Sequence, residues 1–375
     1  MLKVLMAATS FPASQTDWRG RFIFDMAEAL AKAKGMELSL WAPPGELPVG
    51  TWSSLTEEDA EWLMEMVAAG GIAHMLRRSP VIGLFAGIGL IRRLRGVYSL
   101  FASQVESTAV VHSNWLQTAL PLWGTRLPAL VTVLGSDLGL LKVPGMTALL
   151  RSVLKGRRAI LAPNAAWMVP MLQAKFGDVA EVRPIPFGVH SRWFSVRREP
   201  TASTSKDWLM VSRVTRAKLG YLFEWGEGLF GEHRKLHLLG PMQEAIELPS
   251  WVVYHGPTNP VLLADKWFPN VQGLLTLSHH NEGRPQVMIE AMAAGLPIVA
   301  SNLPAHSDLL DHGRLGRLVG AADELCIALD ELEISDVNLS FGKAARQWIV
   351  ENIGTWDDCA ARYVRAYEDL QRSYE

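Results

Sequence analysis

The chain has 375 residues, and its 36 Lys and Arg against 38 Asp and Glu give a formal net charge of −2. Hydrophobic residues make up 49% and charged residues 20%, which argues against disorder and provides enough apolar surface for two domain cores. The charge balance offers no electrostatic basis for a nucleic acid partner, and the two cysteines, which lack metal-like spacing, exclude a disulfide scaffold.

The first eight residues hold one Lys and a short apolar run that passes directly into a loop at residues 9–12. We interpret this segment as a first buried strand and not as a signal peptide. No stretch reaches the roughly 18 uncharged apolar residues that a transmembrane helix requires. We therefore expect a soluble cytoplasmic protein, or one held peripherally at the inner face of the membrane.

Short apolar strands alternate with helical stretches along the whole chain, which is typical of a parallel α/β architecture. In the first half, residues 4–8 are expected to form a strand. Residues 22–33 are expected to form a helix, because Phe22, Met26 and Leu30 recur every four residues. Further strands are expected at residues 38–42, 109–111, 130–133 and 160–162.

Residues 196–207 (VRREPTASTSKD) are charged, rich in Ser and Thr and interrupted by Pro200, so we expect a linker there. The alternation then restarts, with strands expected at residues 208–211, 236–239, 251–254, 274–277 and 297–300. The expected fold class is therefore α/β, with two Rossmann-like doubly wound domains over residues 1–195 and 208–354. Because ligands bind at the carboxyl ends of parallel strands, the two domains are expected to face a central cleft.

A last helix is expected over residues 355–375. Thr355 is a suitable N-cap, and an apolar stripe follows it at spacings of four, three, four and three. The stripe consists of Trp356, Ala360, Tyr363, Tyr367 and Leu370.

The most informative segment is residues 282–301, EGRPQVMIEAMAAGLPIVAS. Pro285 suits the first position of a helix, Gly295 suits the residue just after it, and Pro297 stops any continuation. A helix of about ten residues is therefore expected, with one acid in the loop before it and another in its second turn. Its N-terminus presents free backbone N–H groups, which suit a phosphate or sugar hydroxyl groups.

Glu282, seven intervening residues, Glu290, an Ala-Met pair and a Gly-x-Pro turn follow one another here. This pattern resembles the signature of the family 4 retaining glycosyltransferases (glycosyl transferases group 1), which have the GT-B fold. The resemblance implies that Glu282 contacts hydroxyl groups of the donor sugar and that Glu290 binds the ribose. It also implies a donor-binding stretch, where backbone amides contact the sugar and phosphates, made of Gly283, Arg284, Pro285 and Gln286.

Arg213 and Lys218 follow the strand expected at residues 208–211. They resemble the Arg and Lys, five residues apart, that grip the diphosphate in this family. Two cations at a junction between a loop and a helix can stabilise the charge that grows on a departing diphosphate. Arg216 could replace either cation, and Leu219 stands where the family usually has Gly. The alternative for an isolated pair of this kind is an ordinary solvated surface.

Asp17, Arg19, Gly20 and Arg21 lie in the loop after the first strand. Related enzymes keep a Gly-containing loop there, which leads into the first helix and borders the acceptor. The two arginines would suit an anionic acceptor or the donor phosphate, and a polar helix start is the alternative interpretation.

His112 and Asp137 follow strands where the cleft is expected to open, so both are candidates for sugar contacts, with a structural His as the alternative. Many relatives read His-Gly-Ser-Asp where this chain has Leu134 before Gly-Ser-Asp. Leu134 cannot form the hydrogen bond by which that His contacts the donor sugar. Either the donor sugar differs, another residue such as His112 supplies the contact, or activity has been lost.

The resemblance implies hexosyl transfer with retention of configuration by front-face attack, in which the leaving phosphate takes the acceptor proton. Glu282, Arg213 and Lys218 would then act by positioning and electrostatics. It also implies that the final helix crosses back to the first domain. No Asp-x-Asp occurs, so no metal is expected, and no cofactor is expected beside a nucleotide diphosphate sugar with UDP or GDP as its nucleotide.

Residues 81–91 form an apolar run with basic residues at both ends. The run is too short to span a bilayer, but the segment 77–95 could lie in the interface of an anionic membrane. A buried helix with basic ends is the alternative, and interfacial docking would suit a lipid-linked acceptor. The flanking residues are Arg77, Arg78, Arg92, Arg93 and Arg95.

The sequence thus predicts a retaining glycosyltransferase that moves a sugar to a saccharide or lipid-linked acceptor, in bacterial surface polysaccharide synthesis. A sugar-nucleotide epimerase or phosphorylase on the same double Rossmann plan should lack the segment from Glu282 to Glu290. A catalytically lapsed homologue that acts as a scaffold is supported only by Leu134 and Leu219. A nicotinamide dehydrogenase is disfavoured, because no G-x-G-x-x-G follows any strand.

Overall fold

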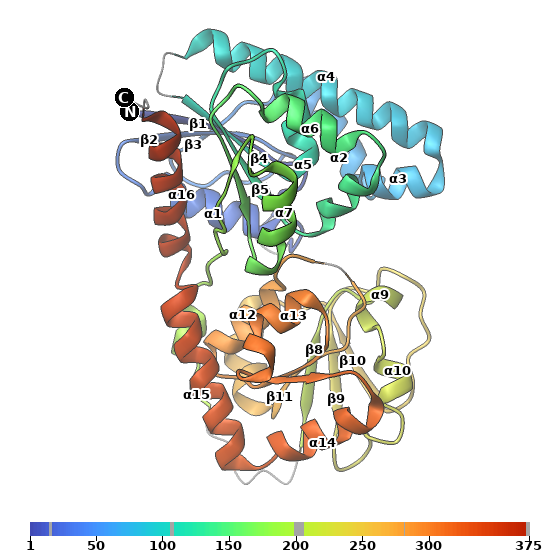
Figure 1. Cartoon of the computed structure of the whole chain (residues 1–375). Coiled ribbons are helices and arrows are strands. Elements are labelled where there is room, and N and C mark those ends of the chain that lie inside the picture. The colour runs from blue at the N-terminus through green and yellow to red at the C-terminus, as the bar shows by residue number, and fades with distance from the viewer. Residues whose placement is uncertain (15–16, 106–108, 199–205, 281, 373–375) are drawn as a thin grey trace. The chain divides into compact units, whose positions relative to one another are not determined.

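The computed structural model describes residues 1–14, 17–105, 109–198, 206–280 and 282–372. The chain divides into two compact units, which we call the first domain (Met1–Phe187 with Trp356–Glu375) and the second domain (Gly188–Thr355) (Figure 1). The chain passes from the first domain to the second after Phe187 and not after residue 195, because Trp193 already packs into the core of the second domain. Of the linker expected at residues 196–207, residues 199–205 lie outside the described residues.

The first domain is built on a parallel sheet with the strand order β3-β2-β1-β4-β5-β6-β7. The order reverses between β1 and β4, so the topological switch point of this sheet lies between these two strands. The strands are β1 (Leu2–Ala7), β2 (Met36–Trp41), β3 (Thr51–Ser53), β4 (Ala109–Asn114), β5 (Ala129–Val133), β6 (Ala159–Pro163) and β7 (Glu181–Val182).

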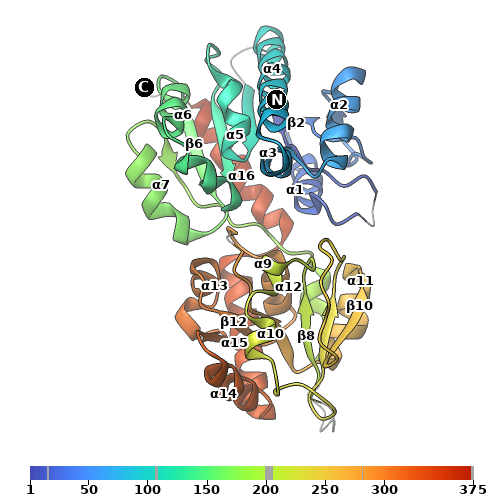
Figure 2. The same cartoon turned by 90° about the vertical axis from the view of Figure 1, so that its right-hand side faces the viewer.

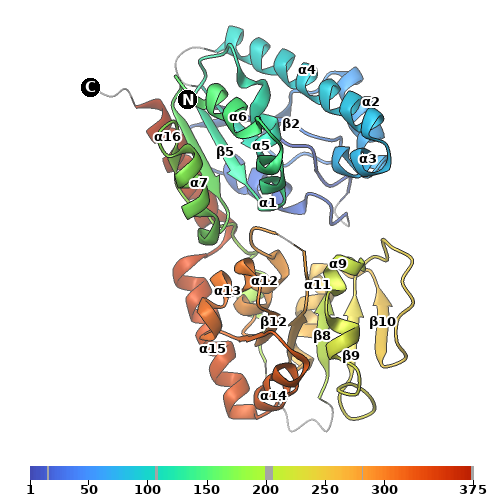
Figure 3. The ribbon, with the colours of Figure 1, turned by 45° about the vertical axis from the view of Figure 1, so that its right-hand side comes forward.

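Helices cover both faces of this sheet (Figure 3). Side chains alternate along β1, so Val4 and Met6 face α1 (Arg21–Ala31) and α16 (Trp356–Gln371), while Leu5 and Ala7 face the opposite layer. That layer consists of α2 (Glu57–Ala68), α4 (Pro80–Gln104), α5 (Leu116–Ala119), α6 (Met146–Leu154) and α7 (Val169–Phe176), with α3 (Ile72–Arg78) beside α4. Short 3-10 segments lie at Leu120–Leu122, Ser136–Lys142 and Ala166–Met168.

The final helix α16 has the apolar stripe that the sequence predicts. All five residues of the stripe are buried in the core that α16 shares with α1 and the strands of the first domain. The helix therefore belongs to the first domain, although the preceding α15 (Ser335–Asn352) belongs to the second.

The second domain is built on a parallel sheet with the strand order β10-β9-β8-β11-β12-β13. Its order reverses between β8 and β11, which places the switch point of this sheet between them. The strands are β8 (Trp208–Val211), β9 (Leu236–Leu239), β10 (Val252–Gly256), β11 (Gly273–Thr276), β12 (Ile298–Ser301) and β13 (Arg317–Val319). The α/β fold class with two Rossmann-like domains is confirmed.

The helices of the second domain also form two layers (Figure 2). One layer contains α10 (Leu222–Trp225) and α14 (Ala322–Leu332), and the other contains α8 (Arg192–Ser195), α12 (Gln286–Ala293) and α15. The remaining segments are α9 (Arg216–Leu219), α11 (Pro260–Leu262), α13 (Pro304–Leu309), the π-helical Leu263–Trp267, and 3-10 segments at Phe268–Asn270 and Asp311–Gly313.

The helix α12 ends as the sequence predicts and begins one residue later. Pro285 is its N-cap and not its first helical residue. At the other end Gly295 has a φ of 72°, and the N–H of Leu296 donates to the carbonyl of Ala291 at 2.8 Å. This bond is typical of a Schellman motif, which needs the left-handed backbone that glycine adopts most readily. The eight-residue helix carries Glu290 in its second turn.

Candidate functional site

The loops that follow β8 and β11 are joined by hydrogen bonds at the switch point of the second domain's sheet. The N–H of His279 donates to the carbonyl of Ala217 at 2.8 Å, and the N–H of Tyr221 donates to the carbonyl of Leu277 at 3.0 Å. The hydroxyl of Ser278 also donates to Ala217, at 3.2 Å. The two loops therefore form one unit at the edge where parallel α/β sheets bind their ligands.

This unit brings two of the predicted catalytic residues together. Lys218 Nζ donates to both carboxylate oxygens of Glu282, at 2.7 and 2.8 Å. The side chains are only 14% and 21% exposed, so solvent screens their attraction less than at an open surface. Thr215 caps the turn that carries the Lys, because its hydroxyl accepts from the N–H of Lys218 at 3.2 Å. Arg213 lies at the start of the same loop, half-buried.

Gly220 explains how the loop tolerates Leu219 where the family usually has Gly. Leu219 is buried in the core, and the sharp turn is made by Gly220 with φ 56° and ψ −119°. A Cβ on Gly220 would lie 1.8 Å from the carbonyl oxygen of Leu277. The close approach of the two loops therefore depends on glycine at 220.

The predicted donor-binding stretch lies just before and at the start of α12. Gly283 is buried, and two of the side chains in the stretch have partners inside the second domain. Arg284 Nη2 lies 2.8 Å from Asp308 Oδ2, and Gln286 Nε2 donates to the carbonyl of Gly188 at 3.0 Å. These contacts fix the side chains of the stretch within the second domain. Glu290 is half-buried on α12.

His306 on α13 lies near the ion pair of Lys218 and Glu282, and it was not among the site residues expected from the sequence. Its ring is fully buried, and Nδ1 lies 2.8 Å from the carbonyl oxygen of Ser301, so Nδ1 carries the proton. Nε2 has no hydrogen-bond partner within the described part of the chain. Burial lowers the pKa of His306, outweighing the Ser301 carbonyl and the charge of Glu282, which act to raise it. The only sequence signal for this residue is its place five residues after β12.

In the first domain, the predicted acceptor loop is held by its own charges. Asp17 accepts from the backbone N–H and the guanidinium Nε of Arg19, both at 3.0 Å. Burial acts to raise the pKa of Asp17, but its hydrogen bonds with Arg19 hold it below the usual value. Gly20 has a φ of 65°, and Arg21 pairs with Asp25 at 2.9 Å on α1.

His112, a candidate for a sugar contact in the sequence, is buried within the first domain. Its ring is fully buried between the sheet and α16, with Nδ1 2.6 Å from Tyr367 Oη and Nε2 2.7 Å from Thr132 Oγ1. Burial lowers the pKa of His112 to about 3, so the ring is neutral. The structural alternative for this residue is the one that the structure supports.

Asp137 is likewise occupied within the first domain. It is 6% exposed, and its carboxylate oxygens accept from the N–H groups of Leu116 and Leu134, both at 3.0 Å. Burial raises the pKa of Asp137 to about 6 in spite of these bonds. The carboxylate holds the loop after β5. Leu134 itself is buried in the core.

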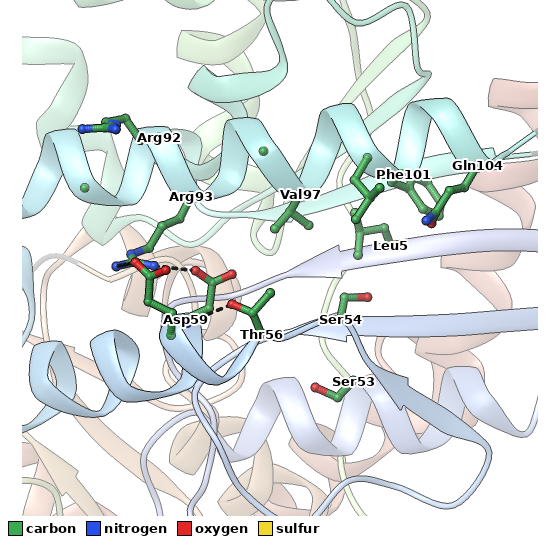
Figure 4. A pocket seen from close by; sticks show the side chains of 14 residues that line it. Leu5, Ser53, Ser54, Thr56, Asp59, Arg92, Arg93, Val97, Phe101 and Gln104 are labelled. Atoms are coloured by element: carbon green, nitrogen blue, oxygen red, sulfur yellow. Dashed lines mark hydrogen bonds and ion pairs between the residues drawn. The ribbon is translucent and has the colours of Figure 1, made fainter.

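A cavity of about 710 Å³ lies elsewhere in the first domain, between α4, the start of α2 and the end of β3 (Figure 4). Arg93 lines it and pairs with Asp59 at 2.8 Å and with Glu58 at 3.0 Å. None of the predicted donor or acceptor residues lines this cavity.

The described residues offer neither a metal site nor a membrane span. Among them, no group of three or more His, Cys, Asp and Glu side chains is placed to hold a metal ion. None of their helices combines the length and the apolar character needed to cross a bilayer.

Comparison with protein families gives one match, in the second domain. Residues 211–333 match the family described as glycosyl transferases group 1. These residues include Arg213, Lys218, Glu282 and Glu290. The resemblance drawn from the sequence is confirmed.

Two curated relatives match shorter stretches. A "Probable sucrose-phosphate synthase" from Thermosipho melanesiensis is 30% identical over 97 residues, which are 26% of this chain and 22% of that protein. A phosphatidyl-myo-inositol mannosyltransferase from Mycobacterium leprae is 38% identical over 89 residues, 23% of this chain and 24% of that protein. The matches thus span about a quarter of the length of these relatives.

Solved structures match over nearly the whole chain. Sucrose-phosphate synthase from Thermosynechococcus elongatus has a TM-score of 0.69 and 15% identity, covering 99% of each chain. HepE from Anabaena, in complex with UDP, has a TM-score of 0.67 and 12% identity, covering 98% of this chain and 100% of that one. At these identities the likeness establishes the fold, which is GT-B.

Proposed function

Since the chain carries a domain of the glycosyl transferases group 1 family, we propose that it is a retaining glycosyltransferase using a nucleotide diphosphate sugar. The observation that carries the proposal is the ion pair between Lys218 and Glu282 at the switch point of the second domain's sheet. A cation suits the diphosphate and a carboxylate suits sugar hydroxyl groups, so the pair supplies both kinds of contact in one place.

The donor would bind along the carboxyl edge of the second domain's sheet. Glu290 would bind the ribose, the amides at the start of α12 would contact the phosphates, and Glu282 would contact the sugar. UDP is the first nucleotide to test, because HepE from Anabaena, which shares the fold, was solved with UDP. GDP is the second choice.

Catalysis would rest on electrostatics and positioning. The bond between the anomeric carbon and the phosphate oxygen breaks with its electron pair going to the diphosphate, where Arg213 and Lys218 would stabilise the added charge. The acceptor oxygen attacks from the same side, and its proton passes to the leaving phosphate. This route retains the configuration and needs no side chain as general base.

The acceptor would be a saccharide, free or lipid-linked, in the synthesis of a bacterial surface polysaccharide. A lipid-linked acceptor is supported by the M. leprae relative, whose name states mannosyl transfer to a phosphatidyl-inositol. The loop from Asp17 to Arg21 would face an anionic acceptor with Arg19 and Arg21. Transfer would take place in the cytoplasm, at the inner face of the membrane.

Calorimetry and thermal shift with UDP, GDP, ADP and CMP test the donor site directly. One diphosphate should stabilise the protein selectively, and the corresponding nucleotide sugars should then be hydrolysed slowly without an acceptor. The alternative is a catalytically lapsed homologue that acts as a scaffold, in line with Leu134 in the core at the place of the family His. Binding without hydrolysis or transfer of any sugar nucleotide would favour this scaffold, and no binding at all would refute the donor site.

A further inference from the structure

The first turns of α4 extend beyond the sheet of the first domain. The helix has 25 residues, or about 37 Å, whereas a six-residue strand spans about 20 Å. Because α4 leads into β4, its last turn lies at the amino edge of the sheet and its first turns lie beyond the carboxyl edge. Figure 4 shows this direction, with α4 running from Arg92 towards Gln104 against the strand that carries Leu5.

The helix α3 packs beside this overhang (Figure 1). The contact is close at Gly83, where a Cβ would lie 2.6 Å from the Cα of Leu76. Glycine therefore lets the two helices form a compact hairpin that projects from the domain. We call this hairpin, residues 72–88, the α3–α4 tip.

The α3–α4 tip gathers exposed large apolar side chains, whereas later in α4 such side chains are mostly buried or half-buried, with Leu100 at 58% as the exception. Later in the helix Leu90, Leu94 and Tyr98 are buried in the core. In the tip, the large apolar residues of α4 are between 44% and 69% exposed, and Gly83 is the buried residue between them. The exposed residues are Leu76 at 43%, Val81 at 63%, Ile82 at 57%, Leu84 at 60%, Phe85 at 69% and Ile88 at 44%.

The charges of the segment that contains the α3–α4 tip have one sign. Arg77, Arg78 and Arg92 are exposed, and within the described part of the chain none of them pairs with an acid. The sequence holds no Asp or Glu between Glu65 and Glu106. Two other arginines of the segment serve the fold: Arg93 pairs with Glu58 and Asp59, and Arg95 donates to the carbonyl of Trp123.

We propose that the α3–α4 tip docks the protein on an anionic phospholipid bilayer. The apolar side chains would enter the boundary between headgroups and acyl chains, and the three arginines would contact lipid phosphates. A second copy of the chain fits this surface poorly, because a symmetric contact would bring the arginines of both copies together with no acid from either tip. The docking does not depend on the transfer reaction. Its use, to hold a lipid-linked acceptor near the carboxyl edge of the first sheet, rests on the proposed function.

Flotation of the full chain with vesicles tests the docking. Vesicles of phosphatidylcholine mixed with phosphatidylglycerol should bind the protein, and raised salt or pure phosphatidylcholine should weaken the binding. Leu84→Gln with Phe85→Gln should lower the binding at least about tenfold, because two large apolar side chains leave the interface. Arg77→Ala with Arg78→Ala should remove most of the preference for the anionic lipid.

Ile327→Gln is the matched control, since Ile327 is 66% exposed on α14 of the second domain and should not affect vesicle binding. Unfolding temperature and nucleotide affinity should match the wild type in all variants, so a failed donor site and a failed docking surface give different results. Absence of vesicle binding, or equal binding by the wild type and the tip variant, would overturn the proposal. Self-association that the tip variant abolishes, without vesicle binding, would identify a second copy as the partner instead.

Discussion

Lys218 and Glu282 stand 64 positions apart in the sequence, yet the ammonium group donates to both oxygens of the carboxylate, at 2.7 and 2.8 Å. The pair links the loop after β8 to the loop after β11, which are also joined through the backbone of Tyr221 and His279. A part-buried ion pair constrains its partners more than an exposed one, because water competes less for either charge. The position of each charge in the candidate site therefore depends on the other.

Glu282→Gln should impair transfer far more than nucleotide binding. The amide keeps the size of the side chain but loses the charge that holds Lys218, so both contacts to the reacting centre are displaced. We expect the turnover rate to fall by about a hundredfold, with the affinity for the nucleotide diphosphate changed by less than about threefold. Steady-state kinetics and calorimetry measure the two quantities.

Glu28→Gln is the control for this substitution, because Glu28 forms an exposed ion pair with Lys32 on α1. It should leave the turnover rate unchanged. A Glu282→Gln enzyme with wild-type turnover would show that the carboxylate has no part in the reaction.

Glu290→Ala should have the opposite effect and weaken nucleotide binding. A carboxylate that accepts hydrogen bonds from ribose hydroxyl groups contributes roughly 1.5–3 kcal/mol, which corresponds to a loss in affinity of about 10- to 100-fold. Calorimetry with the nucleotide diphosphate alone is sufficient, since no transfer is needed. Glu351→Ala, at an exposed position of α15, is the control, and equal affinities for wild type and Glu290→Ala would refute the ribose contact.

Gly220→Ala should damage both stability and the site. Alanine at a φ of 56° costs about 1–2 kcal/mol, and its Cβ would also meet the carbonyl of Leu277 at 1.8 Å. Gly228 is a matched control, because it has a φ of 75° and nothing within 4 Å of a Cβ. Urea unfolding should show a loss for Gly220→Ala that exceeds the loss for Gly228→Ala. Equal losses would mean that the loops after β8 and β11 can move apart with no loss in the free energy of unfolding.

Most strands of the two sheets were predictable from the sequence, because buried parallel strands appear as short apolar runs between turns. The short edge strands β3, β7 and β13 were not among the expected strands. The helix α12 was predictable because Pro285 and Gly295 mark its ends through local backbone chemistry. His306 was not, since a buried ring whose neighbours come from other loops leaves no local pattern.

His112 shows the converse limit of sequence reasoning. A polar residue at the end of a buried strand has the same appearance whether it binds a ligand or a distant part of the chain. Its partner Tyr367 lies 255 positions away, so only the three-dimensional structure reveals the contact. The division at Phe187 was missed for a similar reason, because Trp193 is assigned to the second domain by packing and not by composition.

Tyr367→Phe should destabilise the first domain. The change removes a hydroxyl that lies 2.6 Å from His112 Nδ1, in a fully buried site where water cannot replace it. An unsatisfied buried group costs about 1–3 kcal/mol. Chemical unfolding followed by the fluorescence of tryptophans in the first domain should show this loss, with nucleotide binding by the second domain unchanged. A neutral effect would mean that the ring keeps its place through Thr132 alone.

The stability of the first domain should depend on pH through His112. Its pKa is about 3 when folded and near 6.5 when unfolded, so between these values the unfolded chain binds a proton that the folded one does not. The contribution of the neutral ring to the free energy of unfolding is therefore complete above pH 6.5 and falls by about 1.4 kcal/mol for each pH unit below it.

Asp137 acts in the opposite direction between pH 3.8 and about pH 6, because its raised pKa lets the folded state bind the extra proton there. The pH dependence of the wild type must therefore be compared with that of a variant that keeps Asp137, so that the contribution of Asp137 cancels. The stability advantage of the wild type over His112→Gln should shrink by about 2 kcal/mol from pH 7 to pH 5 in urea unfolding, and parallel curves would show that the ring is not held neutral by burial.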